Sequence, residues 1–500
     1  MARLPVIGGD EDYWGNVLVE FLQVEHDSDG TLKRLNQANG ICPLDSNSLV
    51  PSANLGLKGG YSAIVYIDGS SVIARDHKGD LIASGTAGTD DNDIISSALS
   101  SLTNGRSWKE RVLLKGSFTV ADSVIIPAYT SFQINGKITL ADGVNKPPIR
   151  CDNSDYIDII GGVVDGNGSN QTSYPTGIRG VININSCSFV NVIYTRILNG
   201  YQDGLYVLFD TGDKCVNSLY VVVNSPSSDG IFYDTSNLDL DVESLIVKPC
   251  IYSAGDNPIQ LSDLQGVLIL HPTIESSGSS LSLEDCQDCT ILNPQVRNPS
   301  GHGIVINSAR RGIGKNKVIG GLVTSSTASS ERGVYILQSK DNYIFGVTVY
   351  NFSECFRIDS AGSATLTVER NFVQSCIADT PGSTAFSTGG SGQDNTFLDC
   401  IVKNLGSATA FSLALSGDKA ERYRVDGKPS WAEGSATIAN GNTSVTVNHG
   451  LVSTPTNVQL TGTHSEVKDA YVTNVGSTSF DIKVDSAVTA DRTVYWKAKV

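Results

Sequence analysis

Four short phrases of the 500-residue chain share one pattern, in which a polar residue and a glycine precede an alternating apolar run. They read NGYQDGLYV, SPSSDGIFYD, NPSGHGIVIN and SSERGVYIL. The residue before the glycine is in turn Asp203, Asp229, His302 and Arg332. Carboxylates and an imidazole can move protons, and a guanidinium can bind an anion. This changing position therefore predicts acid–base chemistry along one line of the molecule.

The elements that would position these residues come from a longer repeat. Short β-type runs alternate with Gly, Asn, Ser and Asp turns at a ragged period near 25 residues, which suits a solenoid of short stacked strands. Gly makes up 50 residues and charged residues only 18%, as expected of a turn-rich β protein. We expect a right-handed parallel β-helix of about ten or eleven coils. The last apolar residues of one strand per coil would be Val164, Leu198, Val223, Ile251, Ile274, Val296, Val323, Val349, Ile377 and Val402.

Aligning the phrases on one inward apolar residue places the chemical residues on a single face. The inward residues are Leu205, Ile231, Ile259, Leu281, Ile304 and Val334. The position two residues earlier reads Asp203, Asp229, Asn257, Ser279, His302 and Arg332. Strand periodicity makes the next outward positions Tyr206, Phe232, Gln260, Ser282, Val305 and Tyr335, followed by Leu208, Asp234, Ser262, Glu284, Asn307 and Leu337.

Acids, an imidazole, cations and rings on one face are the combination that a sugar chain requires. Asp203 and Asp229 on adjacent coils would stand about 5 Å apart, the separation of a retaining carboxylate pair. Glu284 lies two coils from Asp229 and Asp234. A pair of carboxyls made with either residue would have the wider separation found in inverting enzymes. We expect Asp203, Asp229, Glu284 and His302 to be catalytic. Substrate would be bound by Asp234, Tyr206, Phe232, Gln260, Arg332 and Tyr335.

A structural explanation of the same residues stays open. Asp-Gly is a common way to enter a strand after a tight turn, because Asp accepts local backbone hydrogen bonds and Gly takes a positive φ. The rings of Tyr206, Phe232 and Tyr335 would then cover the rod or face a neighbouring subunit. In this interpretation the column folds the protein and does no chemistry.

Composition and charge narrow the classes of function that remain for this chain. The net charge of −16 argues against non-specific nucleic-acid binding. No apolar run is long enough to cross a membrane, and MARLPVIGGDEDYWG carries no secretory signal pattern. The ten cysteines lie mostly in apolar strand-like segments, which predicts reduced, buried thiols; the CQDC pair of Cys286 and Cys289 lacks a second CxxC and nearby His. We expect no metal and no cofactor.

The flanks differ from the rod. Residues 1–60 contain one amphipathic stretch (residues 14–21) and then a polar run, typical of an attachment or linker region. Residues 61–110 predict a small hairpin unit and a helix capped by Asp90 or Asp91, whose apolar face would close the end of the first coil. The β-helix would occupy residues 111–428. Residues 429–500 predict five or six antiparallel strands of a small β-sandwich.

Three segments resemble known protein families. GTAGTDDNDIISSALSSL with the following RVLLKGSFTVADSVIIPAYTSF resembles the entry to pectate-lyase-like β-helix proteins. RLPVIGGDEDYWGNVLVEF resembles the head of bacteriophage tail-fibre and tailspike proteins, and SATIANGNTSVTVNHGLVSTPTNVQLTG resembles a module that ends many phage tail proteins. The resemblance implies a homotrimeric tailspike made in the host cytoplasm, carried on the virion tail through its N-terminal region, and acting outside the cell on a capsular or O-antigen polysaccharide.

The series DGI, GDN and GHG, followed by a basic stretch, is also similar to the motif order of polygalacturonases. That similarity implies acid and base roles for Asp229 and Asp256, support from His302 and a substrate clamp at Arg310, Arg311 or Lys315. The chain departs from the family at Asn257, by one extra coil before GHG and in lacking an RxK triplet.

Three functions stay open at this point. The first is an endo-glycosidase with an Asp/Glu pair. The second is a polysaccharide lyase on the same fold, which needs a uronic acid substrate, a base and a cation. The third is an adhesin or structural fibre without turnover.

Overall fold

The computed structural model describes residues 60–209, 215–235, 242–275, 278, 281–309, 314–360 and 367–500. The expected attachment region before residue 60, its amphipathic stretch, Ser279, Arg310 and Arg311 lie outside the described residues.

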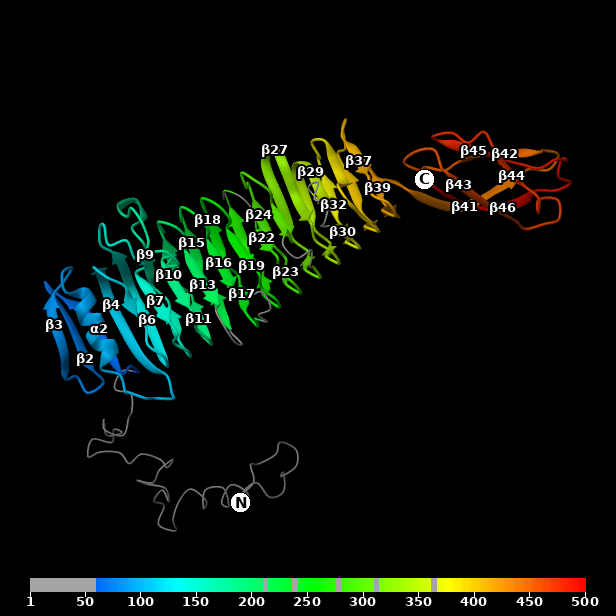
Figure 1. The fold of residues 1–500 in the computed structure, drawn as a ribbon. Coiled ribbons are helices and arrows are strands. Elements are labelled where there is room, and N and C mark those ends of the chain that lie inside the picture. The colour runs from blue at the N-terminus through cyan, green and yellow to red at the C-terminus, as the bar shows by residue number, and fades with distance from the viewer. Residues whose placement is uncertain are drawn as a thin grey trace, which may run out of the picture.

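A small antiparallel unit and one α-helix form the N-terminal end (blue in Figure 1). The strands are β1 (Ala63–Asp68), β2 (Ser71–Asp76) and β3 (Leu81–Thr86), and the helix is α2 (Asp91–Ser100). The helix buries Ile94, Ile95, Ala98 and Leu99 in the main core. β1 also pairs in parallel with β4 (Glu110–Val120). The helix therefore closes the apolar end of the solenoid, as expected.

Asp90 occupies the N-cap position of that helix, as expected, but the capping hydrogen bond is missing. Neither Asp90 nor Asp91 makes a side-chain capping bond within the helix. Asp90 Oδ2 instead accepts the Thr86 N–H at 2.7 Å, and the buried Asp91 accepts the N–H groups of Gly88 (2.9 Å) and Thr119 (2.7 Å). Since Thr119 belongs to β4, Asp91 ties the helix to the first coil.

The rest of the rod is a parallel β-solenoid of about 11 turns (Figure 1). It begins with β4, β5 (Val124–Ile125) and β6 (Thr130–Leu140). Each later coil gives one strand to each of three faces, and each strand pairs in parallel with its counterpart one coil away.

The first face consists of β7 (Ile149–Asp152), β10 (Ile182–Asn185), β13 (Leu205–Phe209), β16 (Ile231–Thr235), β19 (Ile259–Ser262), β22 (Leu281–Glu284), β25 (Ile304–Asn307), the later parts of β27 (Leu322–Leu337) and β29 (Thr348–Asp359), β33 (Thr384–Gly389) and β37 (Thr409–Ser412). The second face consists of β8 (Asp158–Ile160), β11 (Val190–Ile193), β14 (Val216–Leu219), β17 (Leu245–Val247), β20 (Leu268–Leu270), β23 (Thr290–Leu292), β26 (Lys317–Ile319), β28 (Tyr343–Phe345), β31 (Phe372–Gln374), β35 (Thr396–Leu398) and β38 (Lys419–Glu421).

The third face consists of β9 (Val163–Asp165), β12 (Arg196–Leu198), β15 (Val222–Asn224), β18 (Cys250–Tyr252), β21 (Thr273–Glu275), β24 (Gln295–Arg297), the early parts of β27 and β29, β32 (Ile377–Asp379), β36 (Ile401–Lys403) and β39 (Arg424–Val425). Smaller elements are the 3-10 turn η1 (Gly168–Asn170) and the strands β30 (Val368–Glu369), β34 (Gly392–Gln393) and β40 (Lys428–Pro429).

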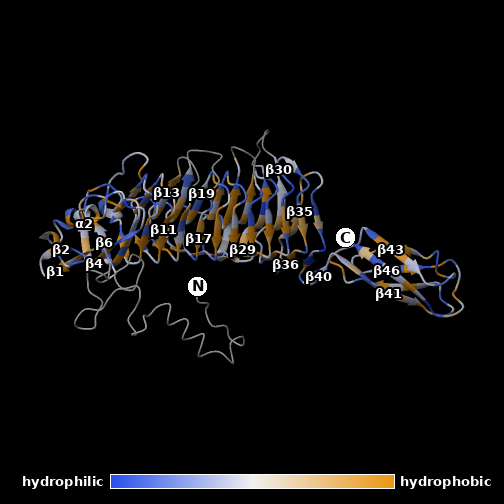
Figure 2. Ribbon diagram, turned by 90° about the horizontal axis from the view of Figure 1, so that it is seen from below, coloured by the Kyte–Doolittle hydropathy of each residue, from blue (hydrophilic) through white to orange (hydrophobic). Residues whose placement is uncertain are grey.

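The expected register of the first face is confirmed. Leu205 pairs with Ile231, Ile231 with Ile259, Ile259 with Leu281, Leu281 with Ile304 and Ile304 with Val334. On the third face the prediction is off by one residue at two coils, where Ile197 and Ala378 take the positions expected of Leu198 and Ile377. The inward residues build one continuous core, with apolar strands and polar turns visible along the rod in Figure 2.

The glycine of the repeated phrase has a different role from the expected one. Gly204, Gly230, Gly303 and Gly333 are absent from the residues of positive φ. A Cβ at Gly230 would lie 2.4 Å from the Pro258 carbonyl oxygen, and one at Gly204 would lie 2.6 Å from the Gly230 carbonyl oxygen. Close approach of neighbouring coils, and not a left-handed turn, therefore requires glycine here.

A buried polar ladder before the second face was not predicted. Asn316 Oδ1 accepts the Cys289 N–H, and Asn342, Asn371, Asn395 and Asp418 each accept the N–H of the preceding ladder residue at 2.9–3.1 Å. Asn316, Asn342, Asn371 and Asn395 are at most 1% exposed. The nine described cysteines are all free and mostly buried, as the sequence indicated.

The C-terminal module has its own core and lies beyond the last coil (orange to red in Figure 1). One three-stranded antiparallel sheet has the order β41 (Trp431–Ile438), β46 (Arg492–Lys499), β43 (Asn457–Gly462). The other has the order β42 (Ser444–Asn448), β45 (Ser479–Lys483), β44 (Tyr471–Thr473). The fold class expected from the sequence is confirmed. Within the described part of the chain, no helix has the length and apolarity needed to span a membrane.

Candidate functional site

One cluster of charges on the first face joins Asp203 and Asp229 through Arg179. The Arg179 Nε lies 2.8 Å from Asp203 Oδ2, and its Nη2 lies 2.9 Å from Asp203 Oδ1 and 3.6 Å from Asp229 Oδ2. Arg179 precedes β10, one coil before Asp203, and is followed by Gly180 at a φ of 82°. A Cβ at Gly180 would lie 2.9 Å from the Tyr206 Cβ, so this glycine admits the Tyr206 side chain.

Both carboxyl groups have raised pKa values. Burial raises the pKa of Asp229 to about 7, and the nearby Asp203 carboxylate raises it further, against the lowering effect of the Asn257 N–H and Arg179. Burial also raises the pKa of Asp203, although Arg179 opposes it. Asp203 is fully buried and Asp229 is 3% exposed. Two carboxyls that share one partly exposed guanidinium favour a state in which one of them keeps its proton at neutral pH.

The same carboxyls also help to hold the coils together. The Asp229 N–H donates to Asp203 Oδ1 at 3.2 Å, and the Asn257 N–H donates to Asp229 Oδ1 at 2.9 Å. The Arg332 N–H donates to His302 Nδ1 at 3.2 Å in the same way. Side chains in the position before the glycine therefore accept hydrogen bonds from backbone N–H groups of the next coil, in addition to any chemical role.

The aromatic side chains expected to stack on sugar are covered in this structure. Tyr206 is 5% exposed and Phe232 is 6% exposed. The Arg179 guanidinium lies over both rings, 5.5 Å and 4.9 Å from their centres, and the two rings meet edge to face. Burial raises the pKa of Tyr206 to about 12. These rings support Arg179 in the observed arrangement.

A hollow of about 380 Å³ lies on the turns that lead into this cluster. It is lined by Gly168, Ser169, Asn199, Gly200, Tyr201, Ser225 and Ser227. Exposed Asp256, on the next coil, acts electrostatically on Asp229 and raises its pKa. Asp203, Asp229 and Asp256 are thus brought together, with one cation and an adjacent hollow.

A second group runs across the face from Asn257, which stacks on Asp229, to Glu284 at the opposite edge. Gln260 Nε2 donates to Glu284 Oε2 at 3.1 Å, and Asn257 Nδ2 donates to Gln260 Oε1 at 2.9 Å. Glu284 pairs with Ser262 in the register, which is the position of Asp234 at the end of β16. Since Asp229 precedes Asp234 by five residues, roughly 16 Å of strand separates Asp229 from that column. The expected Asp229–Glu284 pair is therefore wrong, while Asp234 and Glu284 remain two coils apart on one column.

A third group surrounds His302. Its ring meets Tyr335 edge to face at 5.2 Å, and Arg332 lies over the Tyr335 ring at 4.4 Å. Burial lowers the pKa of His302, which favours a neutral ring whose Nδ1 accepts the Arg332 N–H. Glu331 Oε2 also lies 3.1 Å from Nδ1, a pairing that requires the protonated ring; the backbone bond and the lowered pKa favour the neutral form.

The structure separates residues that the sequence placed together. His302 lies three coils from Asp229 on the first face, about 14 Å away, so it does not support that carboxyl as the similarity to polygalacturonases implied. Arg332 is held by Glu354 at 3.0 Å, and Arg357 binds Glu354 (3.3 Å) and Asp359 (2.8 Å). Arg310 lies outside the described residues.

Three charged residues of the face were missed by the sequence interpretation: Arg179, Glu354 and Arg357. Arg357 pairs with Tyr335 in the register, so extending the outward column by one coil finds it. Arg179 carries no such signal, because it stands one residue ahead of the repeated position. Among the described residues, no three His, Cys, Asp or Glu side chains gather in a way that could hold a metal ion.

Comparison with known proteins bears on the fold. A family model described as periplasmic copper-binding protein (NosD) matches residues 180–407, less than half of the chain. The A-module of the mannuronan C-5 epimerase AlgE6 from Azotobacter vinelandii is similar with a TM-score of 0.50 and 11% identity, over 68% of this chain and 95% of that one. The catalytic domain of a GH87 α-1,3-glucanase has a TM-score of 0.49 and 12% identity, over 66% of this chain and 66% of that one. The Dettilon tailspike protein has a TM-score of 0.44 and 12% identity, over 83% of this chain and 92% of that one.

The comparison with curated proteins found no match. The similarity to the epimerase module shows a shared fold. The chain is a right-handed parallel β-helix protein.

Proposed function

We propose that this chain binds a bacterial surface polysaccharide and cleaves it by endo-glycosidic hydrolysis at the first face. The observation that carries the proposal is Asp229, a buried carboxyl with a pKa of about 7 between Asp203, Arg179 and the exposed Asp256. A proton donor that titrates near neutral pH is what the departing glycosidic oxygen requires. The epimerase module of similar fold is named for its action on mannuronan, and polysaccharide as substrate class is carried to this chain as part of the proposal.

The proposed roles follow from charge and exposure. Asp229 in its protonated form gives its proton to the leaving oxygen. Asp256, one coil further and open to solvent, attacks the anomeric carbon and forms a covalent glycosyl-enzyme as the leaving oxygen departs. The deprotonated Asp229 then takes a proton from water, which attacks the same carbon and releases Asp256 as a carboxylate. The Asp203 carboxyl beside it raises the pKa of Asp229, so Asp229 keeps its proton near neutral pH, while Arg179 opposes the raised pKa of both groups and links them. The hollow lined by Tyr201 and Ser227 would receive the sugar next to the scissile bond.

The test is the chemistry of the products on a panel of purified capsular and O-antigen polysaccharides. New reducing ends without absorbance near 235 nm are expected of a hydrolase. Absorbance that rises with the reducing ends would instead identify β-elimination by a lyase, the alternative that the fold also accommodates. No product from any polymer, with binding retained, would contradict turnover.

One observation favours a second function, that of a non-catalytic adhesin. Asp203 and Asp229 already accept backbone N–H groups of the next coil, and both are almost completely buried. If those bonds are their whole purpose, the chain binds polysaccharide without cutting it. The product assay separates the two functions.

We also propose that the chain is a phage tailspike that acts as a homotrimer on the virion. The sequence resemblance of both ends supports this, and so do large exposed rings on the rod flank. Tyr156, Phe189, Tyr194 and Tyr220 are 38%, 49%, 63% and 39% exposed, and such rings gain by packing against another subunit. Light scattering on the eluting full-length chain is expected to give three times the 53.0 kDa chain mass. A mass of one chain would contradict the trimer.

A further inference from the structure

The sheet β41-β46-β43 of the C-terminal module has a regular outer face. Its strands alternate between exposed side chains and side chains turned to the module core. The register places the exposed residues in three rows across the sheet: Trp431, Lys499 and Asn457; Glu433, Lys497 and Gln459; and Ser435, Tyr495 and Thr461. Trp431 is 43% exposed and Tyr495 is 55% exposed.

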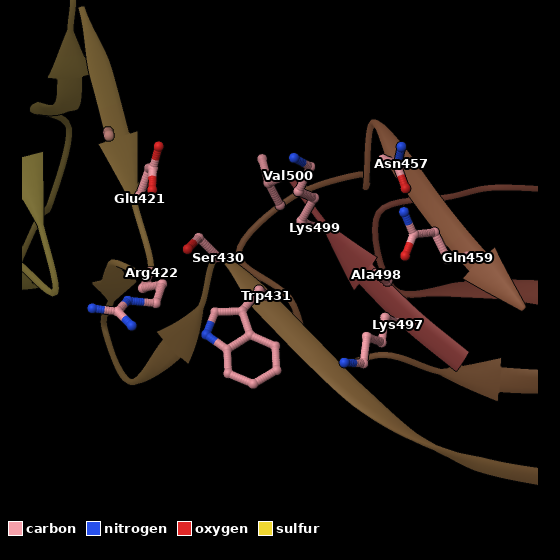
Figure 3. A pocket seen from close by; sticks show the side chains of 11 residues that line it. Glu421, Arg422, Ser430, Trp431, Asn457, Gln459, Lys497, Ala498, Lys499 and Val500 are labelled. Atoms are coloured by element: carbon pink, nitrogen blue, oxygen red, sulfur yellow. The ribbon is translucent and has the colours of Figure 1, made fainter. Parts of the chain in front are cut away.

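Two hollows follow this face. One of about 430 Å³ is lined by Glu421, Arg422, Ser430, Trp431, Asn457, Gln459, Lys497 and Lys499, among others (Figure 3). The other, of about 740 Å³, is lined by Glu433, Gly434, Ser435, Gln459, Thr461, Tyr495, Trp496 and Lys497. They share Gln459 and Lys497, so they adjoin. Their volumes lie in the range of ligand-binding sites.

The spacing of the two rings suits a chain-like ligand. Trp431 pairs with Lys499, and Tyr495 lies four residues from Lys499 along β46, so about 14 Å separates the two ring positions. In Figure 3 the Trp431 indole lies between Arg422 and Lys497, and Asn457 and Gln459 stand on β43 across the central strand. Amide groups can donate to one sugar hydroxyl and accept from another.

The charges of the face point to an acidic ligand. Lys497 is paired with Glu433 at 3.3 Å, and Arg422 is paired with Asp399 at 2.7 Å. Lys499 stands between Trp431 and Asn457 and forms no ion pair with the described residues. This local cation is complementary to a carboxylate on the ligand.

We propose that this outer face is a second saccharide-binding site, specific for a carboxylate-bearing oligosaccharide. Trp431 and Tyr495 stack on two sugar rings, Asn457 and Gln459 bind hydroxyls between them, and Lys499 binds the carboxylate. The site is separate from the first face of the β-helix and does not depend on turnover there. Its effect would be to hold a polymer while the β-helix acts on another part of it.

Hydroxyl-radical footprinting of the full-length chain tests the site directly. The probes are purified acidic capsular polysaccharides and the same polymers after chemical reduction of their carboxyl groups. Trp431 and Tyr495 are expected to be protected by the acidic polymers and not by the reduced ones. Tyr471, on β44 of the other sheet and also 43% exposed, is the internal control and stays unprotected. Equal oxidation of Trp431 and Tyr495 with and without every acidic polymer would overturn the proposal.

Variants measured on an array of the same polysaccharides complete the test. Trp431→Ala and Tyr495→Ala are each expected to weaken binding about tenfold, and Tyr471→Ala to leave it unchanged. Lys499→Gln is expected to remove the preference for the acidic over the reduced polymer. Protection of Trp431 that depends on protein concentration, without polysaccharide, would assign the face to a second copy of the chain and overturn the proposal.

These outcomes are independent of those for the proposed hydrolysis. Product formation by the Trp431→Ala chain, together with loss of protection at Tyr495, would support both sites. Protection at Trp431 in a chain that forms no product would retain this site and reject the hydrolase.

Discussion

Arg179 Nε lies 2.8 Å from Asp203 Oδ2, although the two residues belong to neighbouring coils of the solenoid. The same guanidinium reaches Asp229 one coil further and covers the rings of Tyr206 and Phe232. One side chain therefore sets the charge of two buried carboxyls.

Replacing Arg179 by Ala should destabilise the chain and raise the pKa of Asp229 further, because the opposing positive charge is lost. The expected cost is on the order of 1–3 kcal/mol, below that of a fully buried pair because the Arg179 side chain is 32% exposed. Thermal unfolding at pH 7 measures it, with Arg179→Lys expected to restore part of the loss. An unchanged melting temperature in the Ala variant would show that Arg179 does not hold the carboxyls.

The stability of the chain should fall as pH rises through about 7. The pKa of Asp229 is 3.8 in an ordinary setting and about 7 in the fold, so the folded state binds this proton more tightly. The resulting stabilisation is complete below about pH 3.8 and disappears above the folded pKa. Melting temperatures between pH 5 and pH 9 are expected to fall less steeply in Asp229→Asn than in the wild type. Because the pKa of Asp203 is also raised, the melting temperature of the variant should still fall somewhat with pH. Parallel curves would argue against a raised pKa at Asp229.

Asn371→Ala should cost on the order of 1–3 kcal/mol, because it leaves the buried Asn342 N–H without its acceptor. The loss of the Asn371 Nδ2 bond to the Ser339 carbonyl adds to this. The matched control is Asn440→Ala, an exposed asparagine of the C-terminal module. Denaturant unfolding of both variants compares their free energies of unfolding. Equal values would show that the asparagine ladder does not stabilise the chain.

Hydrolysis at this site should retain the anomeric configuration. Asp256 lies on the coil next to Asp229, one residue before the Asn257 that stacks on Asp229. Coils stack about 4.8 Å apart, so we expect the two carboxyls to be nearer the separation of a retaining pair than that of an inverting pair. Proton NMR of the first product, recorded before mutarotation, shows which anomer is released. Release of the inverted anomer would favour Asp234 and Glu284, which stand two coils apart.

The fold was predictable because its pattern is local and repeated. Leu205, Ile231 and Ile259 recur at nearly constant spacing, so the inward register of the first face follows from strand periodicity alone. Where strand ends carry two adjacent apolar residues, as at Ile197 and Leu198, periodicity does not choose between them, and the prediction slipped by one.

The candidate site was less predictable because its main contacts cross coils. Arg179 sits before the repeated position, and only the turn at Gly180 brings its side chain back over Asp203 and Asp229. Nor does the sequence reveal that Tyr206 and Phe232 would be covered by that arginine. Asp229 and Glu284 seemed compatible as a pair until the register placed them at opposite edges of the face.

The most direct test of the account is reducing-end release by wild type and Asp229→Asn on a polysaccharide that the chain cleaves. Asp122→Asn, which changes a half-exposed carboxylate outside the site, is the control. We predict that Asp229→Asn lowers the rate by at least about 100-fold, as loss of a general acid does, while Asp122→Asn retains the wild-type rate. A wild-type rate in Asp229→Asn, with both variants folded, would contradict the central claim that this carboxyl donates the proton.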